Sequence, residues 1–156
     1  MSELFFGAFT VSRRYPARPA RVFAAFSDRD IKQRWMGCEE VAAPVIERLD
    51  FHVGGREISR GAGQDGAEHL FEGRYLDIVP DRRIVVAFVM QVGGRKISAS
   101  LATAEFTPDG DGTVLTVNEQ GVYFGEDGWA EREEGTAAGL DQLDAWLASQ
   151  SEAVSA

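Results

Sequence analysis

Apolar and polar positions alternate along much of the chain, which indicates a protein built mainly from β-strands. Leu4–Tyr15 is rich in apolar and β-branched residues with partial alternation, and it predicts a first strand. Six more β-rich runs follow, at Val45–Leu49, Gly55–Arg60, Glu68–Val79, Arg83–Gln91, Arg95–Thr107 and Thr113–Gln120. Short separators that contain Gly, Pro and Asp leave no room for crossover helices, so consecutive strands should pair antiparallel. The run Ile84–Met90 is apolar on both faces, so we expect it to be covered on both sides or to lie at the centre of the sheet.

Two short helices are predicted between the first strand and the second. Pro19 suits the first turn of a helix, where its missing N–H matters least, and apolar residues follow at helical spacing as far as Phe26. Ser27 is the expected N-cap of the second helix. Ile31 and Trp35 lie four residues apart on that helix and therefore share one face.

A long amphipathic helix is predicted from Gly128 to Ser149. Its apolar face is formed by Trp129, Thr136, Leu140, Leu143 and Leu147. Gly135 and Gly139 lie four residues apart inside it, and each costs roughly 1 kcal/mol against alanine. The two glycines indicate either a close approach of the helix to a curved sheet or room for a bound molecule. Residues 150–156 are small and polar and are expected to form a frayed tail.

The predicted order of elements is one strand, two short helices, six strands and one long helix. A curved antiparallel sheet must bury its concave face, and the last helix is the one element long enough to cover it. We therefore predict an α+β, helix-grip fold, in which a curved antiparallel β-sheet wraps around a long C-terminal α-helix. A length of 156 residues predicts a single domain, spanning 1–156.

Charge and hydropathy exclude several classes of function. The chain has 16 Lys and Arg against 25 Asp and Glu, a net charge of −9, which argues against a nucleic-acid partner and against an anionic membrane surface. The longest apolar run, Ile84–Met90, is far shorter than the roughly 20 residues that span a bilayer. No basic leader with a long apolar stretch is visible at the start, so we expect a cytoplasmic protein.

The negative charge is concentrated near the C-terminus. Residues 119–156 include nine acidic residues and one basic residue, a net −8, which leaves −1 for the rest of the chain. This segment is either a solvated helix face or a patch that steers a basic partner.

Five segments carry a family resemblance: Ala17–Asp28 with Ile31 and Trp35, Asp50–Gly55, Gly73–Ile84, Thr107–Thr113, and Gly128–Trp129 with Leu140–Leu143. In this order, over about Phe9 to Leu147, they resemble the START-like (SRPBCC) superfamily, and within it the activator of heat-shock-protein-90 ATPase homologue family. The resemblance implies a sheet that grips the last helix with a cavity between them. It also implies a range of functions, since members include lipid and hormone binders, aromatic polyketide cyclases and a eukaryotic co-chaperone module.

The resemblance makes a chaperone partner one hypothesis. It also implies that the co-chaperone function of the eukaryotic relative depends on an additional N-terminal domain. The stretch before Phe9 leaves no room for such a domain. We therefore expect that this chain alone does not stimulate a heat-shock-protein-90 ATPase.

Few residues have catalytic or metal-binding character. The sequence has no Gly-x-Ser-x-Gly elbow, no HExxH motif and no glycine-rich phosphate loop. The one cysteine, Cys38, excludes an internal disulfide framework and is expected to be a small packed residue. His52 lies in a turn-like stretch and should be exposed, and two histidines without repeated acidic spacing give no metal site. We therefore predict no metal and no cofactor, and we name no catalytic residue.

Three groups are nevertheless candidates for binding or proton transfer. His69 shares a strand face with Phe71, and a bulge at Gly73 would bring downstream apolar residues onto that same face. Glu119 has the parity of an inward-facing strand residue, where a carboxylate beside an apolar cavity would be placed for proton transfer. Tyr75 adds a hydroxyl that could orient a ligand.

The leading hypothesis is a non-enzymatic domain that encloses a small apolar or amphipathic molecule, lipid-like or polyketide-like, in a hydrophobic cavity. The candidate cavity residues are Trp35, His69, Phe71, Tyr75, Phe88, Glu119, Tyr123, Trp129, Thr136 and Leu140. Trp35 and Trp129 are expected near opposite parts of its wall. The alternative is a cyclase- or dehydratase-like enzyme that uses Glu119, His69 or Tyr75, which requires these groups to converge on one cavity.

Overall fold

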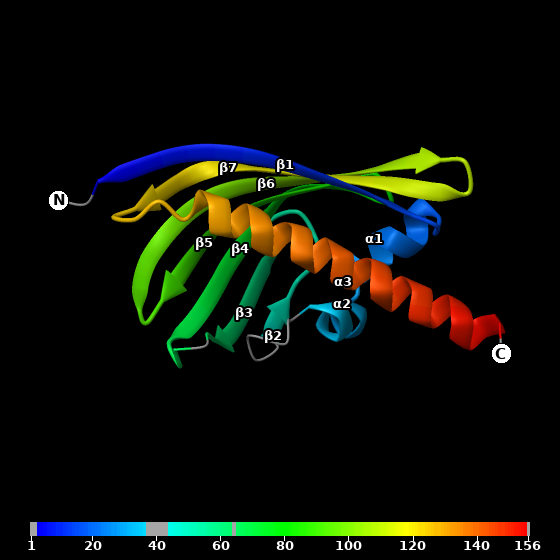
Figure 1. Cartoon of the computed structure of the whole chain (residues 1–156), viewed down its shortest axis with the longest axis horizontal. Coiled ribbons are helices and arrows are strands. Elements are labelled where there is room, and N and C mark those ends of the chain that lie inside the picture. The colour runs from blue at the N-terminus through cyan, green and yellow to red at the C-terminus, as the bar shows by residue number, and fades with distance from the viewer. Residues whose placement is uncertain (1–2, 37–43, 64, 156) are drawn as a thin grey trace.

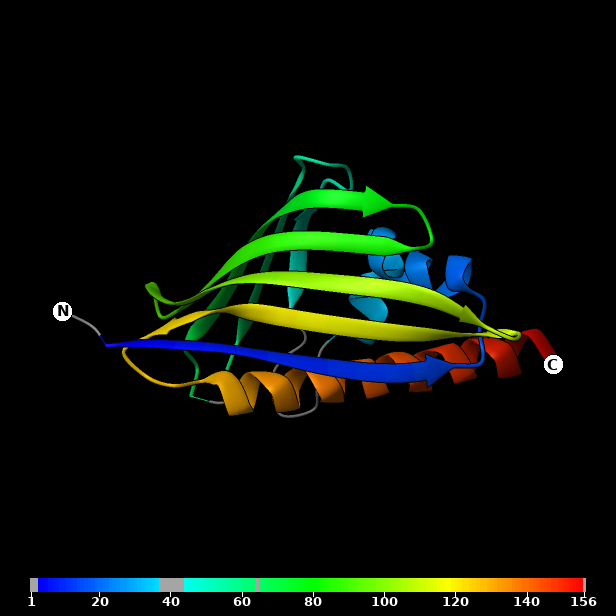
Figure 2. The ribbon, with the colours of Figure 1, turned by 90° about the horizontal axis from the view of Figure 1, so that it is seen from above.

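A seven-stranded antiparallel sheet curves around one long helix in the computed structural model, which describes residues 3–36, 44–63 and 65–155 (Figure 1). The strands are β1 (Leu4–Tyr15), β2 (Val45–Leu49), β3 (Arg56–Ala62), β4 (Glu68–Val79), β5 (Arg83–Val92), β6 (Arg95–Asp109) and β7 (Gly112–Phe124). The helices are α1 (Pro19–Ser27), α2 (Arg29–Trp35) and α3 (Trp129–Ser155). Seen from above, α3 lies on the concave side of the sheet and runs alongside β1 (Figure 2). The predicted α+β helix-grip fold is confirmed.

The order of strands across the sheet is β1-β7-β6-β5-β4-β3-β2, with every neighbouring pair antiparallel. Strands β2 to β7 form the predicted meander, and β1 closes it by pairing with β7. β5 lies in the middle of the seven, which confirms the central position predicted for its two apolar faces.

The β-bulge in β4 lies later in the strand than predicted. The register between β4 and β5 shifts between Tyr75 and Asp77, not at Gly73. Gly73 has a different role, because a Cβ there would meet the ring of Phe71 at 2.9 Å. The extra residue, Leu76, is 49% exposed, while Tyr75 stays buried on the concave side. His69, Phe71, Gly73 and Tyr75 share one face by alternation, and the bulge after Tyr75 brings Ile78, which packs against the core, onto that same face.

Two helix ends also differ from the prediction. Asp28, one residue after the expected Ser27, caps α2, because its carboxylate accepts hydrogen bonds from the backbone N–H groups of Asp30 and Ile31. α3 continues to Ser155 rather than ending at Ser149, and the added residues include no Gly or Pro that would break a helix. Cys38 lies outside the described residues.

One part of the concave face is filled by a hydrophobic core. Leu143 and Leu147 of α3 pack there together with residues of β1, α1, β6 and β7, including Val11, Tyr15, Val22, Phe23, Phe106 and Leu115. Leu140 is 4% exposed and Leu143 is fully buried, as predicted from the helical spacing. The hydroxyl of Tyr15 donates a hydrogen bond to the carbonyl oxygen of Leu140 at 2.8 Å, which fixes α3 against β1.

The acidic residues of α3 are exposed to solvent, and one of them, Asp141, pairs with Arg13 of β1 at 2.8 Å. Its exposed carboxylates are Glu131, Glu133, Glu134, Asp141 and Asp144. Within the described ranges, no helix is both long and apolar enough to cross a membrane.

Candidate functional site

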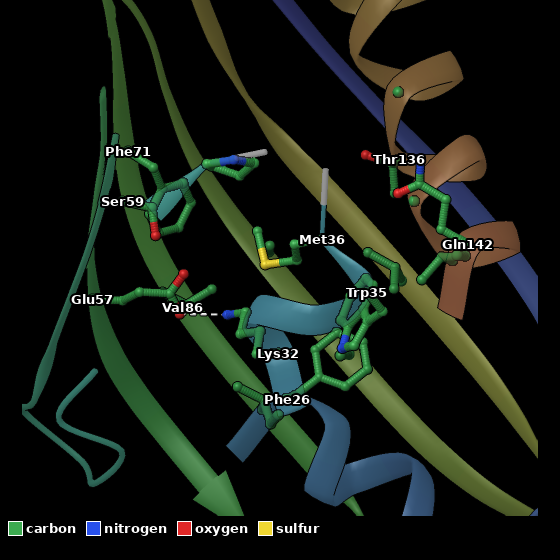
Figure 3. Close-up of a pocket in the computed structure, with 18 of the residues that line it drawn as sticks. Phe26, Lys32, Trp35, Met36, Glu57, Ser59, Phe71, Val86, Thr136 and Gln142 are labelled. Atoms are coloured by element: carbon green, nitrogen blue, oxygen red, sulfur yellow. Dashed lines mark hydrogen bonds and ion pairs between the residues drawn. The ribbon is translucent and has the colours of Figure 1, made fainter. Parts of the chain in front are cut away.

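A pocket of about 540 Å³ lies between the concave face of the sheet, α2 and the middle of α3 (Figure 3). This volume is within the range of small-molecule sites, which extends from about 300 to about 1,000 Å³. Its apolar lining residues are Phe26, Trp35, Met36, Pro44, Phe71, Ile84, Val86, Met90, Ala102, Ala104, Val117, Ala138 and Leu140. Its polar lining residues are Lys32, Glu57, Ser59, His69, Tyr75, Thr103, Thr136 and Gln142.

The two glycines inside α3 form part of the pocket wall. A Cβ added at Gly135 or at Gly139 would meet no atom within 4 Å. The helix therefore does not approach the sheet closely at these positions, and the close-approach explanation for the two glycines is wrong. Both glycines border the pocket, Gly135 at an exposed position and Gly139 at a half-buried one, and a side chain added at either would extend into open space.

Helix α2 is held in place so that its last turn faces the pocket. The indole N–H of Trp35 donates to the carbonyl oxygen of Ala25 at 2.8 Å, which ties α2 to α1. The side-chain amide of Gln33 donates to the carbonyl oxygen of Pro44 and accepts from the backbone N–H of Ile46, which ties α2 to the start of β2. Lys32 and Met36 thereby reach the space in front of the sheet (Figure 3).

A buried polar cluster of Lys32, Glu57 and Tyr75 lies in the pocket wall. The ammonium nitrogen of Lys32 lies 2.5 Å from Oε1 of Glu57, and the hydroxyl of Tyr75 donates to the same oxygen at 2.5 Å. Glu57 is 3% exposed, so its charge is balanced by Lys32 rather than by solvent. Burial, and then the negative charge of Glu57, raise the pKa of Tyr75 well above its usual value, so the hydroxyl remains a protonated donor.

Ser59 lies on the same face of β3 as Glu57 and also lines the pocket. Among the described residues, its Oγ is the buried side-chain polar atom that has no hydrogen-bond partner. Ser59 pairs in register with Phe71, and Gly61 pairs with His69, so Ser59 and His69 both lie on the β3–β4 part of this wall.

Six of the ten candidate cavity residues line this pocket. They are Trp35, His69, Phe71, Tyr75, Thr136 and Leu140. The pocket lining does not include the other four, which are Phe88, Glu119, Tyr123 and Trp129. These four lie instead around the first turns of α3.

The residues around the first turns of α3 form a second buried cluster, which we call the α3 anchor. It consists of Trp129 and Arg132 on α3 and of Phe88, Ser98, Ser100, Glu119 and Tyr123 on the sheet. Arg132 pairs with Glu119 at 2.7 Å, and the hydroxyl of Ser100 donates to the same carboxylate at 2.8 Å. Glu119 does face inward as predicted, but its carboxylate is already paired with the guanidinium of Arg132.

Trp129 belongs to the anchor rather than to the pocket wall because it covers the edge of β1. Its indole N–H donates to the carbonyl oxygen of Phe5 at 2.8 Å, and its ring lies where a side chain on Gly7 would be. The guanidinium of Arg132 lies over the rings of Phe88 and Tyr123, at 5.6 and 5.1 Å from their centres. Of the three proton-transfer candidates, His69 and Tyr75 therefore line the same pocket, whereas Glu119 does not.

Sequence reasoning missed Lys32, Glu57 and Ser59. On β3, Glu57 and Ser59 alternate with Ile58, and alternation places the apolar residue rather than the carboxylate on the buried face. In the structure the reverse holds, because Lys32 and Tyr75 satisfy the carboxylate. Lys32 lies between Ile31 and Trp35, the two apolar residues of α2, but this position does not identify its partner.

The described ranges 3–36, 44–63 and 65–155 contain no group of His, Cys, Asp and Glu residues that could hold a metal ion. His52 is exposed in its turn, as predicted, and its Nδ1 lies 3.1 Å from the carbonyl oxygen of Val53.

Comparisons with known proteins identify the fold and its relatives. Residues 16–148 match the model of the family described as Activator of Hsp90 ATPase homolog 1-like protein. The Mll3558 protein from Rhizobium loti is 44% identical, with a TM-score of 0.83, over 92% of this chain and 98% of that protein. A protein from Rhizobium leguminosarum is 35% identical, with a TM-score of 0.88, over 94% of this chain and 97% of the other. Protein CV1439 from Chromobacterium violaceum is 25% identical, with a TM-score of 0.77, over 89% and 95% of the two chains. No curated protein is similar enough to count as a match.

Proposed function

The chain belongs to the Activator of Hsp90 ATPase homolog 1-like family, and we propose that it binds a small apolar or amphipathic molecule in the pocket between the sheet and α3. The observation that carries this proposal is the pair Gly135 and Gly139. Each glycine lowers the helix propensity of α3, and neither is needed for packing against the sheet. Both are accounted for if the space beside them is occupied by a ligand.

The lining of the pocket supports the same function. Apolar side chains, many of them from β4, β5, β6 and α2, form most of the wall, and a smaller number of polar groups come from α2, β3, β4, β6 and α3. Small-molecule sites commonly combine an apolar wall with a few placed polar groups that orient the ligand.

A catalytic function has less support. The enzyme hypothesis needs Glu119, His69 and Tyr75 within hydrogen-bond reach of one substrate. Glu119 is instead paired with Arg132 in the α3 anchor, and Tyr75 donates to Glu57. Binding without chemistry is therefore the function that the geometry supports best.

The test is a titration with flavonoids, small aromatic polyketides and fatty acids, followed by the backbone amide resonances of the protein. We expect shifts in the strand that carries Phe71 and Tyr75 and in α3 around Gly135 and Gly139. If no compound moves this set of resonances, the proposal is wrong.

A substitution that fills the pocket tests the location. Gly139→Phe places a large ring in open space, so it should reduce binding at least tenfold while the protein keeps its melting temperature. Ala145→Phe, at an exposed position of α3 outside the pocket lining, is the matched control and should bind as the wild type does. Equal loss of binding in both variants would contradict the assignment of the pocket.

A further inference from the structure

We propose that the molecule bound in this pocket is uncharged and carries a hydroxyl or carbonyl group that hydrogen-bonds to the side chain of Ser59 on β3. The inference rests on the proposed function and narrows the chemical class of the ligand. One unpaired buried hydroxyl and the charge balance around it point to such a ligand.

Ser59 supplies the first argument. Its side chain lines the pocket and the residue is only 4% exposed, yet its Oγ makes no hydrogen bond to the described part of the protein. Buried polar groups in folded proteins are nearly always paired, because leaving one unpaired carries most of its desolvation penalty. A ligand group that hydrogen-bonds to Oγ would remove this penalty.

The position of Ser59 fits contact with a ligand. It lies beside Phe71 on the β3–β4 wall, across the pocket from Thr136 and Gln142 on α3 (Figure 3). Across β5 and β6 the lining continues with Ile84, Val86, Met90, Ala102 and Ala104, all apolar, and with one polar residue, Thr103. A molecule that meets Ser59 at one end therefore places most of its remaining surface against apolar groups.

The charge balance supplies the second argument. Among the described residues, Lys32 is the positively charged one that lines the pocket, and its ammonium group is already paired with Glu57 at 2.5 Å. Tyr75 donates its proton to the same carboxylate, so this hydroxyl is also engaged. A ligand carboxylate would lose its hydration without gaining a free cation, and it would lie close to the charge of Glu57. The pocket therefore favours a neutral polar group over an anionic one.

The test is carried out at pH 8, where naphthoate is an anion and naphthol is uncharged. The probes are naphthalene, naphthol and naphthoate, which share one ring system and differ in the polar group. Calorimetric titration of the wild-type protein should rank naphthol above naphthalene by about threefold to tenfold, the ratio given by one net hydrogen bond. Naphthoate should bind more weakly than naphthalene.

Two serine variants identify the residue responsible. Ser59→Ala removes the unpaired hydroxyl, so it should abolish the preference for naphthol over naphthalene without lowering the melting temperature. Ser100→Ala is the matched control, because this buried hydroxyl donates to Glu119 in the α3 anchor, outside the pocket lining. Ser100→Ala should lower the melting temperature and keep the preference for naphthol.

The outcomes separate this inference from the function on which it rests. If naphthalene and naphthol bind equally well, or if Ser59→Ala keeps the preference, the ligand is not anchored at Ser59, although the pocket binds. If naphthoate binds most tightly, the ligand is anionic and the inference is wrong. If none of the three probes binds and the titration with flavonoids, polyketides and fatty acids is also negative, the proposed function itself is wrong.

Discussion

The concave face of the sheet is filled along one stretch of α3 and hollow along another, although both belong to the same helix and the same sheet. Leu143 and Leu147 reach the core in the filled stretch, whereas Gly135 and Gly139 leave open space in the hollow one. The difference lies in the size of the helix side chains, since the backbone of α3 is continuous through both stretches. A helix-grip fold can therefore change the volume of its pocket through a few positions on one helix.

The hollow stretch persists because α3 is held on both sides of it. Before the glycines, Trp129 and Arg132 of the α3 anchor bind Phe5 of β1 and Glu119 of β7. After the glycines, Tyr15 donates to the carbonyl oxygen of Leu140, and the leucines pack in the core. Contacts before and after the pocket therefore hold α3 in place, and the helix residues between them are available to contact a ligand.

The largest effect is expected from shortening a leucine in the filled stretch. Leu143→Ala should lower the free energy of unfolding by an amount near the top of the range of about 2–5 kcal/mol, because the side chain is fully buried among packed neighbours. Leu140→Ala should fall near the bottom of the same range of about 2–5 kcal/mol. Leu140 borders the pocket, so part of its surface already lacks packed neighbours.

Urea unfolding of the two variants beside the wild type measures this difference. Equal losses of stability would show that the space beside Leu140 is packed as tightly as the core, and the contrast between the two stretches would be wrong.

The filled stretch was the more predictable of the two. Leu140, Leu143 and Leu147 follow from helical spacing alone, because an apolar face must be buried somewhere and the sheet offers one concave face. The short connections rich in turn residues predicted the meander, and the central position of β5 followed from its two apolar faces.

The polar part of the pocket was not predictable in the same way. Lys32 and Glu57 are 25 residues apart, and their ion pair depends on how α2 docks against β2 and β3. Glu119 was correctly placed on the inner face, but its partner Arg132 comes from α3, and alternation in one strand carries no information about a helix that covers it. Periodicity predicts which face is buried, but it does not predict which charges meet there.

The next effect is a loss of stability at alkaline pH. Burial raises the pKa of Tyr15 in the filled stretch and of Tyr75 in the pocket wall. A raised pKa means that the folded state favours the protonated hydroxyl. The stabilisation is therefore complete below the ordinary tyrosine pKa of about 10 and decreases as the pH rises above it.

Each of these tyrosines should contribute a loss of about 1.4 kcal/mol per pH unit above about pH 10. Tyr75→Phe removes one ionisable group and should reduce the alkaline slope of the unfolding free energy, and Tyr15→Phe should do the same. The measurement is unfolding by urea at a series of alkaline pH values. An unchanged slope in Tyr75→Phe would mean that its hydroxyl is accessible to solvent in the folded protein.

The smallest effect expected is a gain of stability from replacing a glycine in the hollow stretch. Gly139→Ala adds a methyl group that meets no atom within 4 Å, so only the helix propensity changes, and the protein should gain about 0.8–1.0 kcal/mol. Gly128→Ala is the matched control at the start of the same helix, where the methyl group would lie 2.3 Å from the ring of Tyr123 and should destabilise the protein. Thermal unfolding of both variants gives the two signs directly. If Gly139→Ala also loses stability, α3 packs against the sheet at this position, and the hollow stretch does not exist in solution.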